Sequence, residues 1–163
     1  MVGDRGEFYL VGLGLSPRYL SLEALEVVSR ADLVYVDTYT GPTDLTELQR
    51  LVGRDIIRVT REDLEDRSGE VIIKALERGR VVALLVPGDP LVATTHASLL
   101  LEISRRGYDF HVVPGVSIVP AALTMAGLMA YKIGRVVTVV YPKDGIVFEY
   151  PCLLYTSDAA DER

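Results

Sequence analysis

The alternation of short apolar runs with longer amphipathic runs is the feature that most constrains the fold of this chain. Runs such as FYLVGLG at residues 8–14, DLVYVD at 32–37 and VVALLV at 81–86 have the β-branched, apolar composition of strands. SLEALEVVSRA at 21–31 and GEVIIKALERG at 69–79 instead carry apolar residues at helical spacing. This βα repetition predicts an α/β fold, a mainly parallel open sheet with helices on both faces.

The remaining elements follow the same alternation. Because residues 81–86 are uniformly apolar, they are expected to form a central strand covered on both faces. Ser21 is a typical N-cap, while Gly53 and Gly107 are typical helix ends. Further strands are predicted at 56–59, 110–113 and 135–142, and further helices at 45–53, 90–106 and 117–127.

Composition excludes several classes of protein. The 163 residues are 49% hydrophobic, enough for a buried core, and the net charge of -6 disfavours a broad nucleic-acid-binding surface. One cysteine and two histidines exclude a disulfide framework and make a metal site unexpected. No signal peptide is visible and the apolar runs are too short to cross a bilayer, so we expect a cytoplasmic protein without membrane contact.

The ending CLLYTSDAADER, residues 152–163, continues neither the strand nor the helix pattern. It resembles a translated adapter from a transposon-insertion sequencing library rather than a natural segment. The alternative is a natural polar tail. We therefore expect residues 1–151 to form one domain and residues 152–163 to be foreign to it, so that the natural protein continues beyond residue 151.

Three predicted strands end in unusual turns: GLGL at 12–15, PGDP at 87–90 and PGVS at 114–117. In an open parallel sheet, ligands bind beyond the carboxyl ends of the strands, near a switch in strand order. If these strands are parallel, all three turns lie at one edge. Glycines there let a ligand approach the backbone, and prolines hold that backbone in place. The pattern predicts a shared ligand-binding hollow.

Each turn also has a structural explanation. Asp89 followed by Pro90 is a typical helix start, with Asp as N-cap and Pro in the first helical position, and this capping role is compatible with ligand binding because a carboxylate has two oxygens. Ser117 is an adequate N-cap as well, and GLGL can be a simple βα turn. A lone histidine inside a helix, such as His96, is more often packed than catalytic.

Asp37, at the end of the second predicted strand, invites comparison with the ribose-binding acid of a dinucleotide fold. The G-x-G-x-x-G fingerprint, however, needs a third glycine where this chain has Pro17, and no G-x-x-x-x-G-K-[ST] motif occurs. A Rossmann-type oxidoreductase therefore stays an alternative without a matching motif.

GLGLSPRYLSLEAL, PGDPLVATTHA, VVPGVSI and KIGRVVTVVYP together resemble the N-terminal domain of the diphthine synthase family, a group of tetrapyrrole-methylase-like methyltransferases. The similarity extends over about residues 7 to 150. It implies that residues 1–151 are an N-terminal S-adenosylmethionine-binding α/β domain of a truncated enzyme, inactive on its own. Carried over by motif, the cofactor-binding residues are Leu15, Asp89, Val92, Ser117 and Ile118, together with Gly12 and Gly14 in the first turn.

The resemblance also implies the reaction. Such enzymes methylate the amino group of the modified histidine of elongation factor 2 in diphthamide biosynthesis, as homodimers that use S-adenosylmethionine and no metal. It names no catalytic residue; His96 and Asp37 are only candidates for the base that deprotonates the acceptor amine. The alternatives are a tetrapyrrole-precursor methylase, the oxidoreductase above, and an inert binding or dimer-forming fragment.

Overall fold

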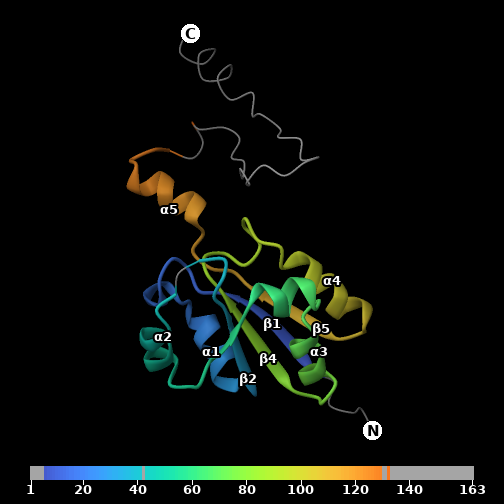
Figure 1. The fold of residues 1–163 in the computed structure, drawn as a ribbon. Coiled ribbons are helices and arrows are strands. Elements are labelled where there is room, and N and C mark those ends of the chain that lie inside the picture. Colours follow the sequence, from blue (N-terminus) through green and yellow to red (C-terminus); the bar gives the residue numbers. More distant parts are fainter. Residues whose placement is uncertain (1–5, 42, 130–131, 133–163) are drawn as a thin grey trace. The chain divides into compact units, whose positions relative to one another are not determined.

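The structure is a computed structural model that describes residues 6–41, 43–129 and 132. The chain divides into two units, Met1–Ile118 and Val119–Arg163, and each is described by itself. In the described part of the first unit, strands alternate with helices (Figure 1). Its elements are β1 (Glu7–Gly12), the 3-10 turn η1 (Pro17–Tyr19), α1 (Leu22–Arg30), β2 (Leu33–Asp37), α2 (Leu45–Val52), β3 (Ile57–Val59), the π-helical turn η2 (Glu62–Asp66), α3 (Glu70–Leu76), β4 (Val81–Val86), α4 (Ala97–Arg105) and β5 (Asp109–Val113).

These strands form a parallel sheet in the order β3-β2-β4-β1-β5. The predicted parallel α/β fold is therefore confirmed. β4 lies in the middle, paired with β2 on one side and with β1 on the other, where Leu10 is opposite Leu84. Four of its side chains and Val86 at its end are fully buried, as predicted for a strand covered on both faces.

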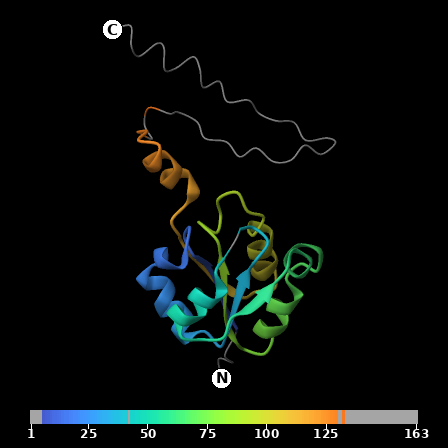
Figure 2. The same cartoon turned by 60° about the vertical axis from the view of Figure 1, so that its left-hand side comes forward.

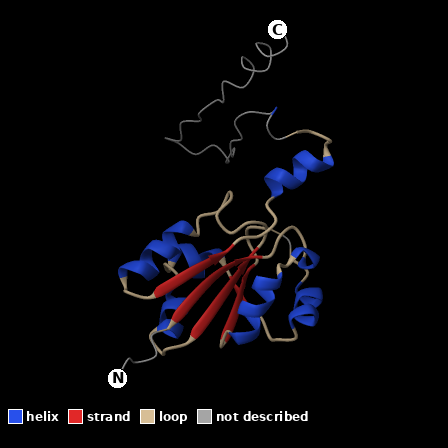
Figure 3. Cartoon of the chain, turned by 180° about the vertical axis from the view of Figure 1, so that it is seen from behind, coloured by secondary structure: helices blue, strands red, loops and turns tan. Residues whose placement is uncertain are grey.

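Helices cover both faces of the sheet (Figures 2 and 3). Successive side chains of a strand point to opposite faces, so Phe8 and Leu10 belong to one hydrophobic cluster, and Tyr9 and Val11 belong to the other. α3 and α4 pack on the first face, and α1 and α2 pack on the second. The helical residues buried against the sheet include Ile72, Leu76, Leu99 and Ile103 on the first face and Ala24, Val27, Val28 and Leu48 on the second.

The direction of winding reverses between β1 and β4. From β1 the chain proceeds through β2 to β3 with its helices on one face, and from β4 it proceeds to β5 with its helices on the other. The loops after β1 and β4 therefore leave neighbouring strands toward opposite faces. A crevice opens at such a switch point, and this is where open α/β sheets bind ligands.

The predicted helix ends are confirmed where the structure describes them. The Ser21 hydroxyl accepts a hydrogen bond from the Ala24 amide at 3.1 Å, as an N-cap should. Gly53 closes α2 in the left-handed conformation, with φ of 66°. Gly107 ends α4 with φ of 79° and donates its amide hydrogen bond to the Ser104 carbonyl at 2.9 Å.

The helix predicted for residues 90–106 is wrong in its first half, because α4 begins only at Ala97. Asp89 caps a single turn: its Oδ1 accepts a hydrogen bond from the Leu91 amide at 3.0 Å, and its carbonyl accepts one from the Val92 amide at 3.2 Å. No helix continues from that turn.

Two local features turn the chain away from a helix. Ala93 has φ of 57°, a left-handed conformation that costs an alanine about 1–2 kcal/mol and interrupts helical bonding. The Thr94 hydroxyl then donates to the Pro90 carbonyl at 2.7 Å. The helical spacing of the apolar residues concealed this loop, although the β-branched residues Val92, Thr94 and Thr95 are poor helix formers.

The helix α5 (Ile118–Met125) lies within the predicted range 117–127. It ends at Met125, and Gly127, which follows two residues later, has φ of 69° and donates to the Thr124 carbonyl. None of the described helices is both long and apolar enough to span a membrane. The strand predicted at 135–142 and the foreign segment predicted at 152–163 lie outside the described residues.

Candidate functional site

The exits of β1, β4 and β5 meet at one edge of the sheet, as predicted. The Gly14 amide donates to the Gly88 carbonyl at 3.1 Å, and the Gly88 amide donates to the Gly14 carbonyl at 2.8 Å. Asp89 connects the second loop to the third, since its Oδ2 lies 3.4 Å from the Gly115 amide nitrogen. The three turns thus form one continuous surface.

Two glycines allow this close approach. A Cβ atom on Gly12 would lie 2.5 Å from the Gly115 nitrogen and 2.8 Å from the Gly88 carbonyl oxygen. A Cβ atom on Gly115 would in turn lie 2.8 Å from the Gly12 Cα. Any side chain at either position would therefore push the first and third loops apart.

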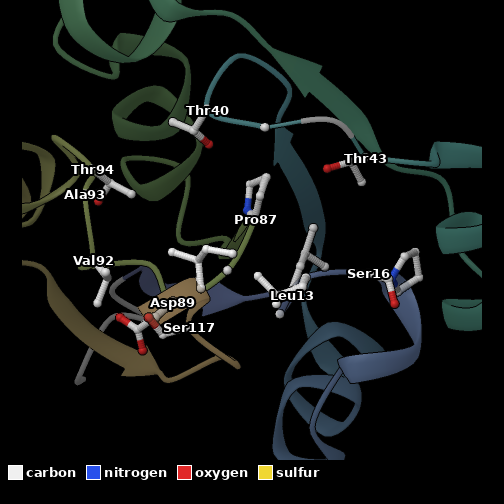
Figure 4. A pocket seen from close by; sticks show the side chains of 16 residues that line it. Leu13, Ser16, Thr40, Thr43, Pro87, Asp89, Val92, Ala93, Thr94 and Ser117 are labelled. Carbon is white, nitrogen blue, oxygen red and sulfur yellow. The ribbon is translucent and has the colours of Figure 1, made fainter. Parts of the chain in front are cut away.

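A pocket with a volume of about 340 Å³ opens between these loops (Figure 4). This volume falls in the usual range for a small-molecule site. Six of the seven predicted cofactor-binding residues line it, while Gly12 lies outside the lining, in the contact with Gly115 described above. The six are Gly14, Leu15, Asp89, Val92, Ser117 and Ile118.

Asp89 lines the pocket while it holds two loops together. Its Oδ1 accepts from the Leu91 amide, and its Oδ2 receives only the long contact from Gly115. A carboxylate has about four acceptor positions, so both oxygens keep capacity for a ligand. The capping role and the ligand role predicted for this residue are compatible in this geometry, although the cap serves one turn and not α4.

The residues that form a second wall of the pocket were not predicted. Figure 4 shows Thr40 and Thr43, from the loop after β2, and Ala93 and Thr94, from the loop before α4. For Thr40 and Thr43 the signal is the strand order, because β2 is the other neighbour of β4 and its exit reaches the same edge. That order cannot be read from one sequence.

Behind Thr40 lies the buried carboxylate of Asp37. Its Oδ1 accepts from the amides of Tyr39 at 2.8 Å and Thr40 at 3.1 Å, and its Oδ2 accepts from the Thr40 hydroxyl at 2.7 Å. Burial raises the pKa of Asp37, but the contact with His96 and these hydrogen bonds outweigh burial and lower the pKa below its ordinary value of 3.8. Asp37 is thus an ionised anchor of its own loop and does not line the pocket, unlike the ribose-binding acid with which it was compared.

His96 is buried beside this carboxylate. Its Nε2 lies 3.2 Å from Asp37 Oδ2, yet the ring orientation gives neither ring nitrogen a well-directed hydrogen bond. The Tyr39 ring is stacked nearby, with ring centroids 6.4 Å apart. Burial, followed by the negative charge of Asp37, raises the pKa of the Tyr39 hydroxyl to about 12. The interpretation of His96 as a packed side chain fits its burial, and like Asp37 it does not line the pocket.

Comparison with known proteins connects this geometry to a family. The family model for tetrapyrrole (corrin/porphyrin) methylases matches residues 7–149, which include all three loops and both walls of the pocket. The chain belongs to the tetrapyrrole methylase family. The five-stranded sheet that the structure describes is accordingly a tetrapyrrole methylase fold.

Within the tetrapyrrole methylases, the chain is similar to proteins named diphthine synthase. It is 41% identical to the one from Pyrobaculum neutrophilum, over 94% of this chain and 60% of that protein. It is 45% identical to the one from Pyrobaculum aerophilum, over 87% of this chain and 56% of that protein. A crystal structure of diphthine synthase superimposes with a TM-score of 0.72 at 38% identity, covering 78% of this chain and 51% of that chain. The chain thus spans about 60% or less of these relatives.

Proposed function

We propose that this chain is the cofactor-binding part of a diphthine-synthase-type methyltransferase and that its pocket binds S-adenosylmethionine. The observation that carries the proposal is the meeting of the three motif-bearing loops around a single pocket, in a chain 38–45% identical to diphthine synthases. Residues 1–151 would form the natural domain, and residues 152–163 would not belong to it.

The pocket suits such a ligand chemically. S-adenosylmethionine supplies an activated methyl group on a sulfonium, and it carries an ammonium and ribose hydroxyls that need hydrogen-bond acceptors. Asp89 offers acceptor capacity, and the bare backbone around Gly14 and Gly88 lets a ligand approach closely. Leu15, Val92 and Ile118 would pack its apolar parts.

In this proposal the residues of the chain act by binding and orientation. Methyl transfer to an amine is an in-line displacement, so alignment of donor and acceptor and exclusion of water supply much of the acceleration. Backbone contacts at Gly12 and Gly115 hold the first and third loops at fixed positions. A site fixed before the ligand binds loses less conformational entropy on binding.

We further propose that the acceptor is the amino group on the modified histidine of elongation factor 2, in diphthamide biosynthesis, and that the enzyme is a cytoplasmic homodimer. Identity to proteins named diphthine synthase supports this acceptor over a tetrapyrrole precursor. Radiolabelled methyl transfer to elongation factor 2 carrying the intermediate, compared with transfer to a tetrapyrrole precursor, tests the choice.

Isothermal titration of the chain with S-adenosylmethionine tests the cofactor proposal. The wild type should bind, and Asp89→Ala should weaken binding about tenfold or more, because a hydrogen bond to a charged group is lost. NADH titrated in parallel should not bind. Binding of NADH in place of S-adenosylmethionine would favour the oxidoreductase alternative.

Asp44→Ala is the matched control. Asp44 caps α2 through the Glu47 amide at 3.0 Å and lies outside the pocket. Its substitution should lower the free energy of unfolding by about 1 kcal/mol and leave ligand affinity unchanged. If Asp89→Ala behaves like Asp44→Ala, Asp89 acts only as a cap and the proposed role is wrong.

A further inference from the structure

The proton of the Thr40 hydroxyl is already used. Thr40 Oγ1 lies 2.7 Å from Asp37 Oδ2, and that carboxylate is buried and ionised, so the hydroxyl must be the donor in this hydrogen bond. A hydroxyl has a single proton. Toward the pocket that it lines, Thr40 can therefore offer only lone pairs.

The hydroxyl of Thr94, on the neighbouring loop, also donates its proton within the protein. Its Oγ1 lies 2.7 Å from the Pro90 carbonyl oxygen, and a carbonyl can only accept. Thr94 also lines the pocket, and in the view of Figure 4 it lies with Thr40 above Asp89 and Ser117. Two loops of different origin thus present hydroxyl oxygens that can only accept hydrogen bonds.

One carboxylate contacts Thr40, and a second lines the same pocket. Asp37 is one hydrogen bond behind Thr40, and the Asp89 carboxylate lines the same pocket. His96, 3.2 Å from Asp37 Oδ2, is the titratable group on the far side of that carboxylate. Hydroxyl oxygens that can only accept, one of them bonded to a carboxylate, favour a ligand group that is cationic and rich in N–H donors.

We propose that Thr40 and Thr94 form a subsite for a protonated amine, which their hydroxyl oxygens hold as hydrogen-bond acceptors. The inference rests on the proposed function for the source of the amine. It is either the ammonium of the methyl donor or the amine that is to be methylated. Both present the same –NH₃⁺ chemistry to the two threonines.

Three probes separate these sources at constant ionic strength. S-adenosylhomocysteine carries the ammonium, 5′-methylthioadenosine is the nucleoside thioether without it, and n-butylamine is an ammonium alone. Their dissociation constants are measured by calorimetry for the nucleosides and by ligand-observed NMR for n-butylamine. The amine is measured in the presence of 5′-methylthioadenosine.

The variants are Thr40→Val, Thr94→Val and the conservative Thr40→Ser and Thr94→Ser, which keep the hydroxyls. Thr38→Val is the matched control. Thr38 lies on the same loop as Thr40 and does not line the pocket, and its hydroxyl donates to the Val59 carbonyl at 3.4 Å. Unfolding midpoints check that each variant is folded. If Thr40→Val is unfolded because it has lost the hydrogen bond to Asp37, the result for Thr94→Val decides the test.

If the subsite binds the ammonium of the methyl donor, the valine variants should bind S-adenosylhomocysteine about tenfold more weakly and 5′-methylthioadenosine as the wild type does. The serine variants should bind both nucleosides nearly as the wild type does. If the subsite binds the amine of the acceptor instead, the valine variants should lose affinity for n-butylamine only. The inference is wrong if every variant binds each of the three probes as tightly as the wild type does. It is also wrong if the valine variants lose the same affinity for both nucleosides. A wild type that binds neither nucleoside refutes the proposed function, and n-butylamine then tests the subsite alone.

Discussion

At the scale of single residues, the Asp37 carboxylate determines the shape of one wall of the pocket. It accepts three hydrogen bonds from the two residues that follow it closely, Tyr39 and Thr40, although it has no exposed surface. A buried carboxylate that is satisfied in this way stabilises the fold only while it is ionised. The loop that carries Thr40 is therefore coupled to the charge of Asp37.

Asp37→Asn should lower the free energy of unfolding by about 1–3 kcal/mol at pH 7, because the amide cannot replace both oxygens as acceptors. The pKa of Asp37 is lower in the folded protein than in the unfolded one, so its contribution is present above about pH 4 and is lost as the pH falls through the folded pKa. The difference between wild type and variant should shrink on acidification. Urea unfolding at pH 7 and at pH 3 measures it.

Asp63→Asn is the control for this pH dependence. The backbone and side chain of Thr60 lower the pKa of the Asp63 carboxyl too, but that carboxyl is exposed to solvent. Its effect should be much smaller, because water screens exposed charges. An Asp37→Asn variant whose deficit is the same at both pH values would contradict the role given to the Asp37 charge.

At the scale of elements, the loop between β4 and α4 shows where sequence reasoning failed. The described strands and the helices α1 and α2 were predictable because period and caps agreed along each run, and α3 was predictable from its period. In residues 90–106 the helical spacing of apolar residues continued through a segment that is not helical before Ala97 and that contains the left-handed residue Ala93. The pocket lining includes that residue, so the local departure from helical geometry occurs where the site is built.

The pair Ala93→Gly and Ala97→Gly tests this element. Ala93 has φ of 57°, where glycine is unstrained, so its substitution should leave the free energy of unfolding within about 0.5 kcal/mol of wild type or raise it. Ala97 begins α4, and glycine there should lower the free energy of unfolding by up to about 1 kcal/mol. Equal losses in thermal or urea unfolding would support a helix from residue 90 instead.

Gly115→Ala tests the contact between the first and third loops. Its new Cβ would lie 2.8 Å from the Gly12 Cα, so the loops must separate. We expect a loss of about 1–3 kcal/mol in unfolding free energy, as for other overpacked sites, and weaker binding of S-adenosylmethionine in calorimetry. Gly107→Ala is the control: with φ of 79° and open space around it, it should cost about 1 kcal/mol without affecting the ligand.

At the scale of the whole molecule, fold class and site were predictable to different depths. The parallel sheet and the convergence of three turns followed from βα repetition, because parallel strands end at one edge. Thr40 was not predicted as a pocket residue, since its place depends on β2 lying next to β4, and the spacing of residues within one strand does not show which strand pairs with it. Thr94 was missed because its segment was predicted as helix. The pairing of Asp37 with His96 depends on the same strand order.

The strand order also predicts how a ligand should affect the unit as a whole. The pocket joins the exits of β1, β2, β4 and β5, so a bound ligand contacts most of the described sheet through its loops. A ligand that binds only the folded state stabilises it by mass action. S-adenosylhomocysteine at a concentration 100 times its dissociation constant should raise the free energy of unfolding by about 2.7 kcal/mol. With a tenfold weaker Asp89→Ala variant, the same concentration should give about 1.4 kcal/mol.

Hydrogen exchange locates this stabilisation. The amides of Leu84 and Leu85, in the fully buried centre of the sheet, exchange only when the sheet opens. If the ligand binds across the strand exits, their exchange should slow by the factor that corresponds to the change in unfolding free energy. Slowing confined to the loop amides near Asp89, with β4 unchanged, would show that the ligand orders one loop only, and the pocket would then not connect the sheet in the way the strand order implies.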